Sequence, residues 1–264
     1  MDPKLEKEIK PKANLRFEDY KEDDLSSADL READLFKANF TNTDLSNARL
    51  TGANMYGAKL QNANLNMAWL EGAYLIGADL READLSEAEL VLAKLENANL
   101  TKANLVNANL TGANLREANL RGASLRGANL IGAFFPYADL READLRGVGL
   151  IKAYMREADL RSADLKYASL TGVDMVNASL SKANLTGADL IGANLREADL
   201  REAHLFKVNL IGADLSNAKL TGANLREAEL TGADLTRAKL DDINHTNQPE
   251  ILAELEKRVP TNNA

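Results

Sequence analysis

Large apolar side chains recur at every fifth residue of this chain. Every position from 25 to 240 that is divisible by five is large and apolar, and 39 of these 44 positions hold Leu. The other five are Phe40, Met55, Phe135, Met155 and Met175. We call this position the Leu slot. A pattern kept in phase over more than two hundred residues indicates a repeat architecture.

The residues around each Leu slot follow the same period. Two residues earlier lies an Ala slot, with Ala at 39 of the 43 positions from 28 to 238. The exceptions are Thr43, Val148, Val173 and Val208. Between the two lies an outward slot, with Asn or Asp at 28 of 44 positions, and after the Leu come a first and a second corner slot. The repeat is therefore A-[DN]-L-x-x.

A five-residue period excludes both common secondary structures. On an α-helix, five residues advance the direction by roughly 140°, so the leucines would surround the helix. On a flat strand, side chains alternate with period two, so successive leucines would face opposite sides. The period instead predicts a coil in which Ala and Leu point inward and the next two residues form a corner.

Glycine marks these corners. Of the 16 glycines, 15 occupy the second corner slot, where a type II turn requires positive φ, and Asn recurs there too. Sorted by a period of twenty, 8 of the 15 share a single one of the four columns, whereas a period of fifteen gives 3, 6 and 6, with no single preferred column. The sequence therefore predicts four repeats per coil.

These residues closely resemble the pentapeptide-repeat family over residues 13–240. The resemblance implies an all-β fold, a right-handed quadrilateral β-helix of four pentapeptides per coil. We expect about 11 coils and, at ~4.8 Å per coil, a rod of roughly 55 Å. Residues 1–24 would form an N-terminal cap and degenerate first repeats, 25–240 the β-helix, and 241–264 a C-terminal capping segment. A capping helix is predicted near 248–258, with Ile251, Leu252, Leu255 and Val259 as a candidate dimer interface.

The composition excludes most catalytic chemistry. There is no Cys, there are only two His, and no phosphate-binding or catalytic motif occurs, so we expect no enzyme activity, no cofactor and no metal site. His204 is expected to be a solvated outward residue. Asp139 with Asp159, and Asp144 with Asp164, are expected to bond corner backbone, with Arg141 and Arg161 as countercharges, rather than to bind calcium.

The net charge restricts the classes of partner that the repeats can bind. The chain carries −8, but residues 25–240 hold 24 basic and 27 acidic residues, so the repeats are nearly neutral and we expect no direct nucleic-acid binding. No stretch is apolar enough to span a membrane and the N-terminus lacks a signal-peptide core, which favours a cytoplasmic protein.

One cluster departs from the polar exterior. We expect Phe134 and Tyr154 to flank the same corner as Ile131 and Ile151 on consecutive coils, with Tyr137 close by, and the five residues to form a partner or dimer surface. The leading function is therefore a structural scaffold that binds a protein partner. The alternative, from the family resemblance, is a DNA mimic that binds DNA gyrase or topoisomerase. A net −3 over the repeats, against about 32 phosphate charges on a duplex of ~55 Å, disfavours this alternative.

Overall fold

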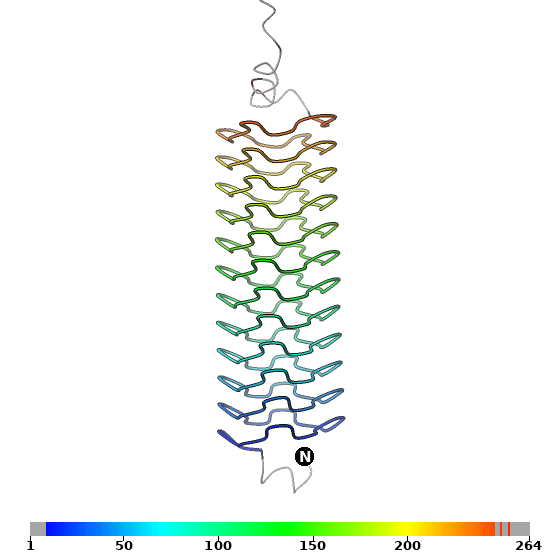
Figure 1. Cartoon of the computed structure of the whole chain (residues 1–264), viewed down its shortest axis with the longest axis vertical. Helices are drawn as coiled ribbons and strands as arrows, with labels where there is room; N and C mark the ends of the chain where they lie inside the picture. The colour runs from blue at the N-terminus through cyan, green and yellow to red at the C-terminus, as the bar shows by residue number, and fades with distance from the viewer. Residues whose placement is uncertain (1–8, 246–248, 250–252, 254–264) are drawn as a thin grey trace, which may run out of the picture.

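The chain winds as one uninterrupted coil. The computed structural model describes residues 9–245, Pro249 and Ala253. Residues 9–245 stack turn upon turn into a straight rod with the N-terminal coils at one end (Figure 1). This stretch contains neither a helix nor an extended strand. Instead, each outward slot forms an isolated parallel bridge to the residue twenty positions along, from the pair Asn14 and Asp34 to the pair Asn224 and Asn244. One turn of the coil therefore takes four pentapeptides.

The corners have the geometry that the glycines predict. In the turn at Leu50, the carbonyl of Leu50 accepts a hydrogen bond from the N–H of Ala53 at 2.9 Å, and Gly52 has φ of +67°. All second corner slots from Lys12 to Asp242 have positive φ, and 32 of these 47 residues are not glycine. The type II corner is therefore confirmed, and the stack imposes it even on residues that disfavour it.

In a repeat with Asn in the outward slot, every backbone N–H has a partner, as residues 99–103 show. The N–H of Leu100 and that of Lys102 donate to carbonyls of one neighbouring coil at 2.7 and 3.0 Å, and the N–H of Asn99 donates to the other coil at 2.9 Å. Ala103 closes the turn at 3.0 Å. The N–H of Thr101 donates to the side-chain oxygen of Asn99 at 3.1 Å. The outward Asn or Asp thus supplies the one acceptor that the stacked backbone lacks.

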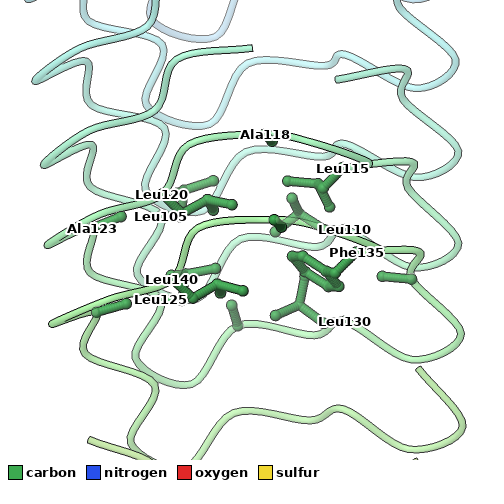
Figure 2. Packing of buried hydrophobic residues seen from close by; sticks show 14 of the residues in the cluster. Leu105, Leu110, Leu115, Ala118, Leu120, Ala123, Leu125, Leu130, Phe135 and Leu140 are labelled. Atoms are coloured by element: carbon green, nitrogen blue, oxygen red, sulfur yellow. The ribbon is translucent and has the colours of Figure 1, made fainter. Parts of the chain in front are cut away.

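The leucines fill the inside of the coil, as predicted. Figure 2 shows Leu120 and Leu140, and likewise Leu115 and Phe135, pointing inward from adjacent coils. Every Leu-slot side chain from 25 to 240 is buried, including the Phe and Met exceptions. Thr43, in an Ala slot, is buried as well, and its hydroxyl donates to the carbonyl of Tyr20 at 2.5 Å.

The two ends are described to different extents. Ala13, Leu15 and Tyr20 already point inward, so the repeat conformation begins before residue 25. At the other end, Pro249 and Ala253 are helical and exposed. The rest of the predicted capping helix near 248–258, with Ile251, Leu252, Leu255 and Val259, lies outside the described residues. Within the described part of the chain, no helix has the length and apolar character needed to cross a membrane.

Candidate interaction surface

The stacked carboxylates have a structural role. Asp139 bridges to Asp159, and Arg141 holds Asp139 through two hydrogen bonds of 2.8 and 2.5 Å. Arg161 pairs with Asp159 at 2.6 Å. The hydrogen bonds from Arg141 hold the pKa of Asp139 below its ordinary value, although burial opposes this shift. These contacts confirm the predicted countercharges. Nowhere in residues 9–245 do three or more His, Asp or Glu side chains gather in a group that could hold a metal ion.

The two histidines occupy separate environments. His204 is exposed in an outward slot, where it bridges to Asn184 and Asn224, as predicted. His245 lies at the last bridged coil, and its Nδ1 is buried without a hydrogen-bond partner among the described residues. About two coils separate the two side chains, because their positions differ by 41 and one coil takes twenty residues.

The five residues of the predicted surface lie on two adjacent coils. Phe134 bridges to Tyr154, and their ring centroids are 6.0 Å apart with an interplanar angle of 53°. Ile131, Phe134, Tyr137 and Tyr154 are exposed, and Ile151 is half-buried. The guanidinium of Arg116 lies 5.9 Å from the ring centroid of Tyr137. Phe134 and Tyr154 thus lie in contact on one side of the rod, with Ile131 and Ile151 on the corner before it and Tyr137 on the corner after it.

Phe134 replaces the side chain that usually accepts a backbone hydrogen bond, and the residue two positions later compensates for this. In most repeats the outward Asn or Asp accepts the N–H two residues later, and Phe134 cannot do this. The residue two positions on is Pro136, which has no N–H to satisfy. An aromatic side chain therefore replaces the usual amide here without leaving a donor unpaired. Tyr154 lacks such compensation, because residue 156 is Arg and its N–H has no side-chain acceptor at position 154.

Comparison with known proteins identifies the family. A model of pentapeptide repeats matches the chain in eight copies, including residues 28–66, 63–101, 108–147, 123–161, 138–175, 183–222 and 209–244. The chain belongs to the pentapeptide-repeat family. Its coil is accordingly a right-handed β-helix, and pentapeptide-repeat proteins are generally non-enzymatic scaffolds.

Solved structures of the family include several relatives. HetL, a pentapeptide-repeat protein involved in heterocyst differentiation regulation in the cyanobacterium Nostoc sp. strain PCC 7120, is 37% identical, with 85% of this chain and 91% of HetL covered and a TM-score of 0.30. A trypsin-treated variant of QnrB1, a plasmid-mediated fluoroquinolone resistance protein, is 18% identical, with 94% and 96% covered and a TM-score of 0.32. Rfr23, from the cyanobacterium Cyanothece 51142, is 30% identical, with 47% and 88% covered and a TM-score of 0.22. No curated protein sequence matched the chain.

The apolar surface of this pentapeptide-repeat rod is longer than the five predicted residues. We define the apolar side as the row of outward slots from Asn14 to Asp234, one every twenty residues, with the two corners that flank it. Ten of the thirteen exposed large hydrophobic residues among those described lie on this side. They are Phe17, Tyr56, Tyr74, Leu92, Ile131, Phe134, Tyr137, Tyr154, Ile191 and Ile211.

The N-terminal part of the apolar side is an aromatic stack. The rings of Phe17 and Phe36 meet edge to face at 5.4 Å, and Phe36 stacks on Tyr56 at 5.5 Å. The guanidinium of Arg16 lies 4.5 Å from the Phe36 ring centroid. Sequence analysis missed these residues, although the twenty-residue column that predicts the coil also places Phe36 and Tyr56 in one row. Three aromatic rings in contact present a rigid apolar surface at this end.

Proposed function

We propose that this protein is a non-enzymatic scaffold whose apolar side binds a protein partner. The observation that carries the proposal is the uneven distribution of exposed hydrophobic residues, ten of thirteen of which lie on one side of the rod. The side as defined holds five of the twelve outward-facing positions of each coil, so an even distribution would place about five of the thirteen residues there. Exposed apolar surface gathered on one side of a protein is typical of an interaction site.

Phe134 and Tyr154 are the anchors that we propose for this contact. They are 39% and 51% exposed, so each ring is held by its neighbours and still presents apolar area to a partner. Aromatic side chains are enriched at the centres of protein interfaces, and charged pairs usually form the rim. Here Arg156 pairs with Asp174 at 2.7 Å and Arg116 with Glu117 at 3.1 Å beside the aromatic residues.

The proposal is tested with the double variant Phe134→Asn and Tyr154→Asn. Asn already occupies this row at Asn114 and Asn194, so the coil should fold normally and keep its thermal unfolding midpoint. Proteins bound to the immobilised rod from host extract, and self-association in sedimentation velocity, are compared for wild type and variant. We expect the double variant to lose at least one partner, or the self-association, that wild type shows.

Met67→Asn is the matched control. Met67 is 44% exposed but lies outside the apolar side, and its second corner slot accepts Asn at Asn47 and Asn107. Removing Met67 should leave binding unchanged. Identical captured proteins and identical sedimentation for wild type, control and double variant would refute the proposal.

Surface charge disfavours the alternative of DNA mimicry toward gyrase. A mimic needs a line of uncompensated negative charge, whereas Asp139, Asp144 and Asp199 each pair with an Arg two residues later at 2.5 Å. Their carboxylates are therefore locally neutralised. A DNA supercoiling assay with purified protein distinguishes the two functions, and we expect neither inhibition nor protection of gyrase at micromolar protein.

A further inference from the structure

A second surface lies away from the apolar side, on the corner that follows Leu105, Leu125, Leu145 and Leu165. It is a hollow of about 360 Å³. Its lining comes from the two corner slots of four successive coils and comprises Val106, Asn107, Arg126, Gly127, Arg146, Gly147, Lys166 and Tyr167. We call it the basic hollow. None of the residues of the apolar side contributes to it.

Two consecutive glycines form the hollow. In the row of second corner slots, Gly127 and Gly147 lie between Asn107 and Tyr167, so two coils lack a side chain where their neighbours carry one. A Cβ at Gly147 would meet nothing within 4 Å, whereas a Cβ at Gly127 would meet the side-chain oxygen of Asn107. The hollow is therefore open over Gly147 and bounded at its N-terminal end by Asn107, whereas the ring of Tyr167 leans over Gly187, on the side away from Gly147.

A row of cations lines one long edge. Arg126, Arg146 and Lys166 occupy the same slot on three successive coils, and so lie about 4.8 Å apart along the rod. Arg146 pairs with Asp144 at 2.5 Å, and Lys166 with Asp164 at 3.5 Å.

Arg126 lacks the corresponding partner. The outward slot two residues before it holds Ser124 in place of Asp, and the guanidinium makes no ion pair within 4.0 Å among residues 9–245. The basic hollow therefore has at its edge one guanidinium without an ion pair in that range, whose nearest described countercharge effect is on Asp144 of the next coil, and two further cations in line with it. No acidic residue belongs to its lining.

The shape of the hollow favours an extended chain. Four coils span about 14 Å, which corresponds to about four residues of an extended peptide. Cations in a row match a chain of carboxylates better than one compact anion, which could reach only one or two of them. The lining also offers the side-chain amide of Asn107, which suits the backbone of a peptide.

A nucleic acid fits this surface less well. Asp144 and Asp164 lie directly beside the cations and would face the phosphates, and like charges at close range oppose binding. A peptide carries N–H donors as well as carboxylates and can use these acceptors.

We propose that the basic hollow binds an extended acidic segment of a partner protein. This contact is separate from the apolar side and does not depend on it.

The probe for this proposal is a fluorescently labelled octa-glutamate peptide, and its binding to the full chain is measured by anisotropy at 50 mM salt. We expect Arg126→Gln to weaken binding about two- to fivefold, which is the range for one exposed charge contact. Gly147→Glu should weaken it further, because it places a carboxylate in the open part of the hollow. Glu is compatible with this backbone, since Glu87 adopts φ of +57° in the same row. Raising the salt to 300 mM should weaken binding of the wild type.

Arg226→Gln is the matched control, because Arg226 lies in the same row five coils along and outside the hollow. It removes the same charge and should leave peptide affinity unchanged. Three results would overturn the proposal: no binding of the peptide at 50 mM salt, equal losses for Arg126→Gln and Arg226→Gln, or tighter binding of an oligothymidylate of the same length that is also lost in Arg126→Gln.

Discussion

Truncating one internal leucine tests the inward orientation on which the fold depends. Leu125 is fully buried in the middle of the rod, between the coils of Leu105 and Leu145. Leu125→Ala removes three carbon atoms, worth about 2.4 kcal/mol at ~0.8 kcal/mol for each buried carbon. A cavity term adds to this transfer cost. The adjacent coils cannot collapse into the space, because the N–H of Leu125 is tied to the carbonyl of Asp144 at 2.8 Å and that of Leu105 to Ser124 at 2.7 Å. We therefore expect a total loss of about 3–5 kcal/mol.

The loss should be local, because each coil of a solenoid contacts only its neighbours. Native-state hydrogen exchange measures this, since it reports the free energy of opening at each amide. The amides of Leu105 and Leu125 should lose protection by the full amount. The amide of Leu205, four coils away and bonded to the carbonyl of Asn224 at 2.8 Å, should lose little.

Leu92→Ala is the control for the same chemical change on the outside. Leu92 is 65% exposed in a second corner slot, and its side chain covers Gly112. Its truncation should cost less than about 1 kcal/mol, as is usual for surface changes. Equal costs for Leu92→Ala and Leu125→Ala, or a loss at Leu125 below about 1 kcal/mol, would refute the proposition that the leucines hold the rod together.

Three further predictions concern the corners and the outward slots. Asn99→Ala removes the acceptor of the N–H and of the hydroxyl of Thr101, and should lower the free energy of unfolding by about 1–2 kcal/mol in chemical denaturation, whereas Lys59→Ala in the same row should change it little. Gly187→Ala should destabilise more than Gly212→Ala. Both have positive φ, but only a Cβ at Gly187 meets the Tyr167 ring, at 2.8 Å, and thermal unfolding compares the two. Arg201→Gln should raise the pKa of Asp199 toward its ordinary value, as measured by carboxyl NMR titration. Because Arg201 lowers that pKa in the folded state, wild type gains stability above pH ~4 and loses it as the pH falls, and the variant should show less of this dependence.

The interior of the rod could be predicted from sequence because it obeys one short rule. A Leu slot every five residues and an Ala slot two residues earlier leave no other face for burial, and even the exceptions Met55 and Phe135 are buried. The outward Asn and Asp were predicted to bond corner backbone, and Asn99 does so with Thr101. These features are local, and each repeat shows them without reference to distant residues.

Residue preferences for backbone conformation do not predict the corner residues, because hydrogen bonding between stacked coils determines φ there. Propensity predicts Gly or Asn in a slot with positive φ, yet Leu92 and Tyr137 adopt +57° and +60° there. The left-handed conformation costs such residues on the order of 1 kcal/mol. They tolerate it because the N–H of the second corner slot must reach the carbonyl of the next coil, as that of Leu92 reaches Thr111 at 3.0 Å.

The five-residue repeat also could not predict how far the apolar side extends along the rod. Tyr74 and Phe134 are sixty residues apart in the chain, and only the twenty-residue register places them in one row. Similarly, the basic hollow depends on Gly127 and Gly147 falling in one row, with Arg126, Arg146 and Lys166 beside them. Each of these residues alone is an ordinary corner residue, and the surface exists only when the coil is assembled.

The fold and the surfaces are therefore encoded at different periods. The Leu and Ala slots repeat every five residues, so a chain that gains or loses one pentapeptide would still bury its leucines and pair its coils. The same change would turn every later residue by one side of the coil, because four pentapeptides complete a turn. Phe36 and Tyr56 would then no longer share a side with Phe134 and Tyr154. Burial of the core demands only the five-residue phase, whereas the observed alignment of hydrophobic residues from Phe17 to Ile211 demands the twenty-residue phase over ten coils. Core packing gives no reason for that longer register, and ring contacts such as that of Phe36 with Tyr56 align only neighbouring coils. The proposed partner, contacting one side of the rod, would account for alignment along its whole length.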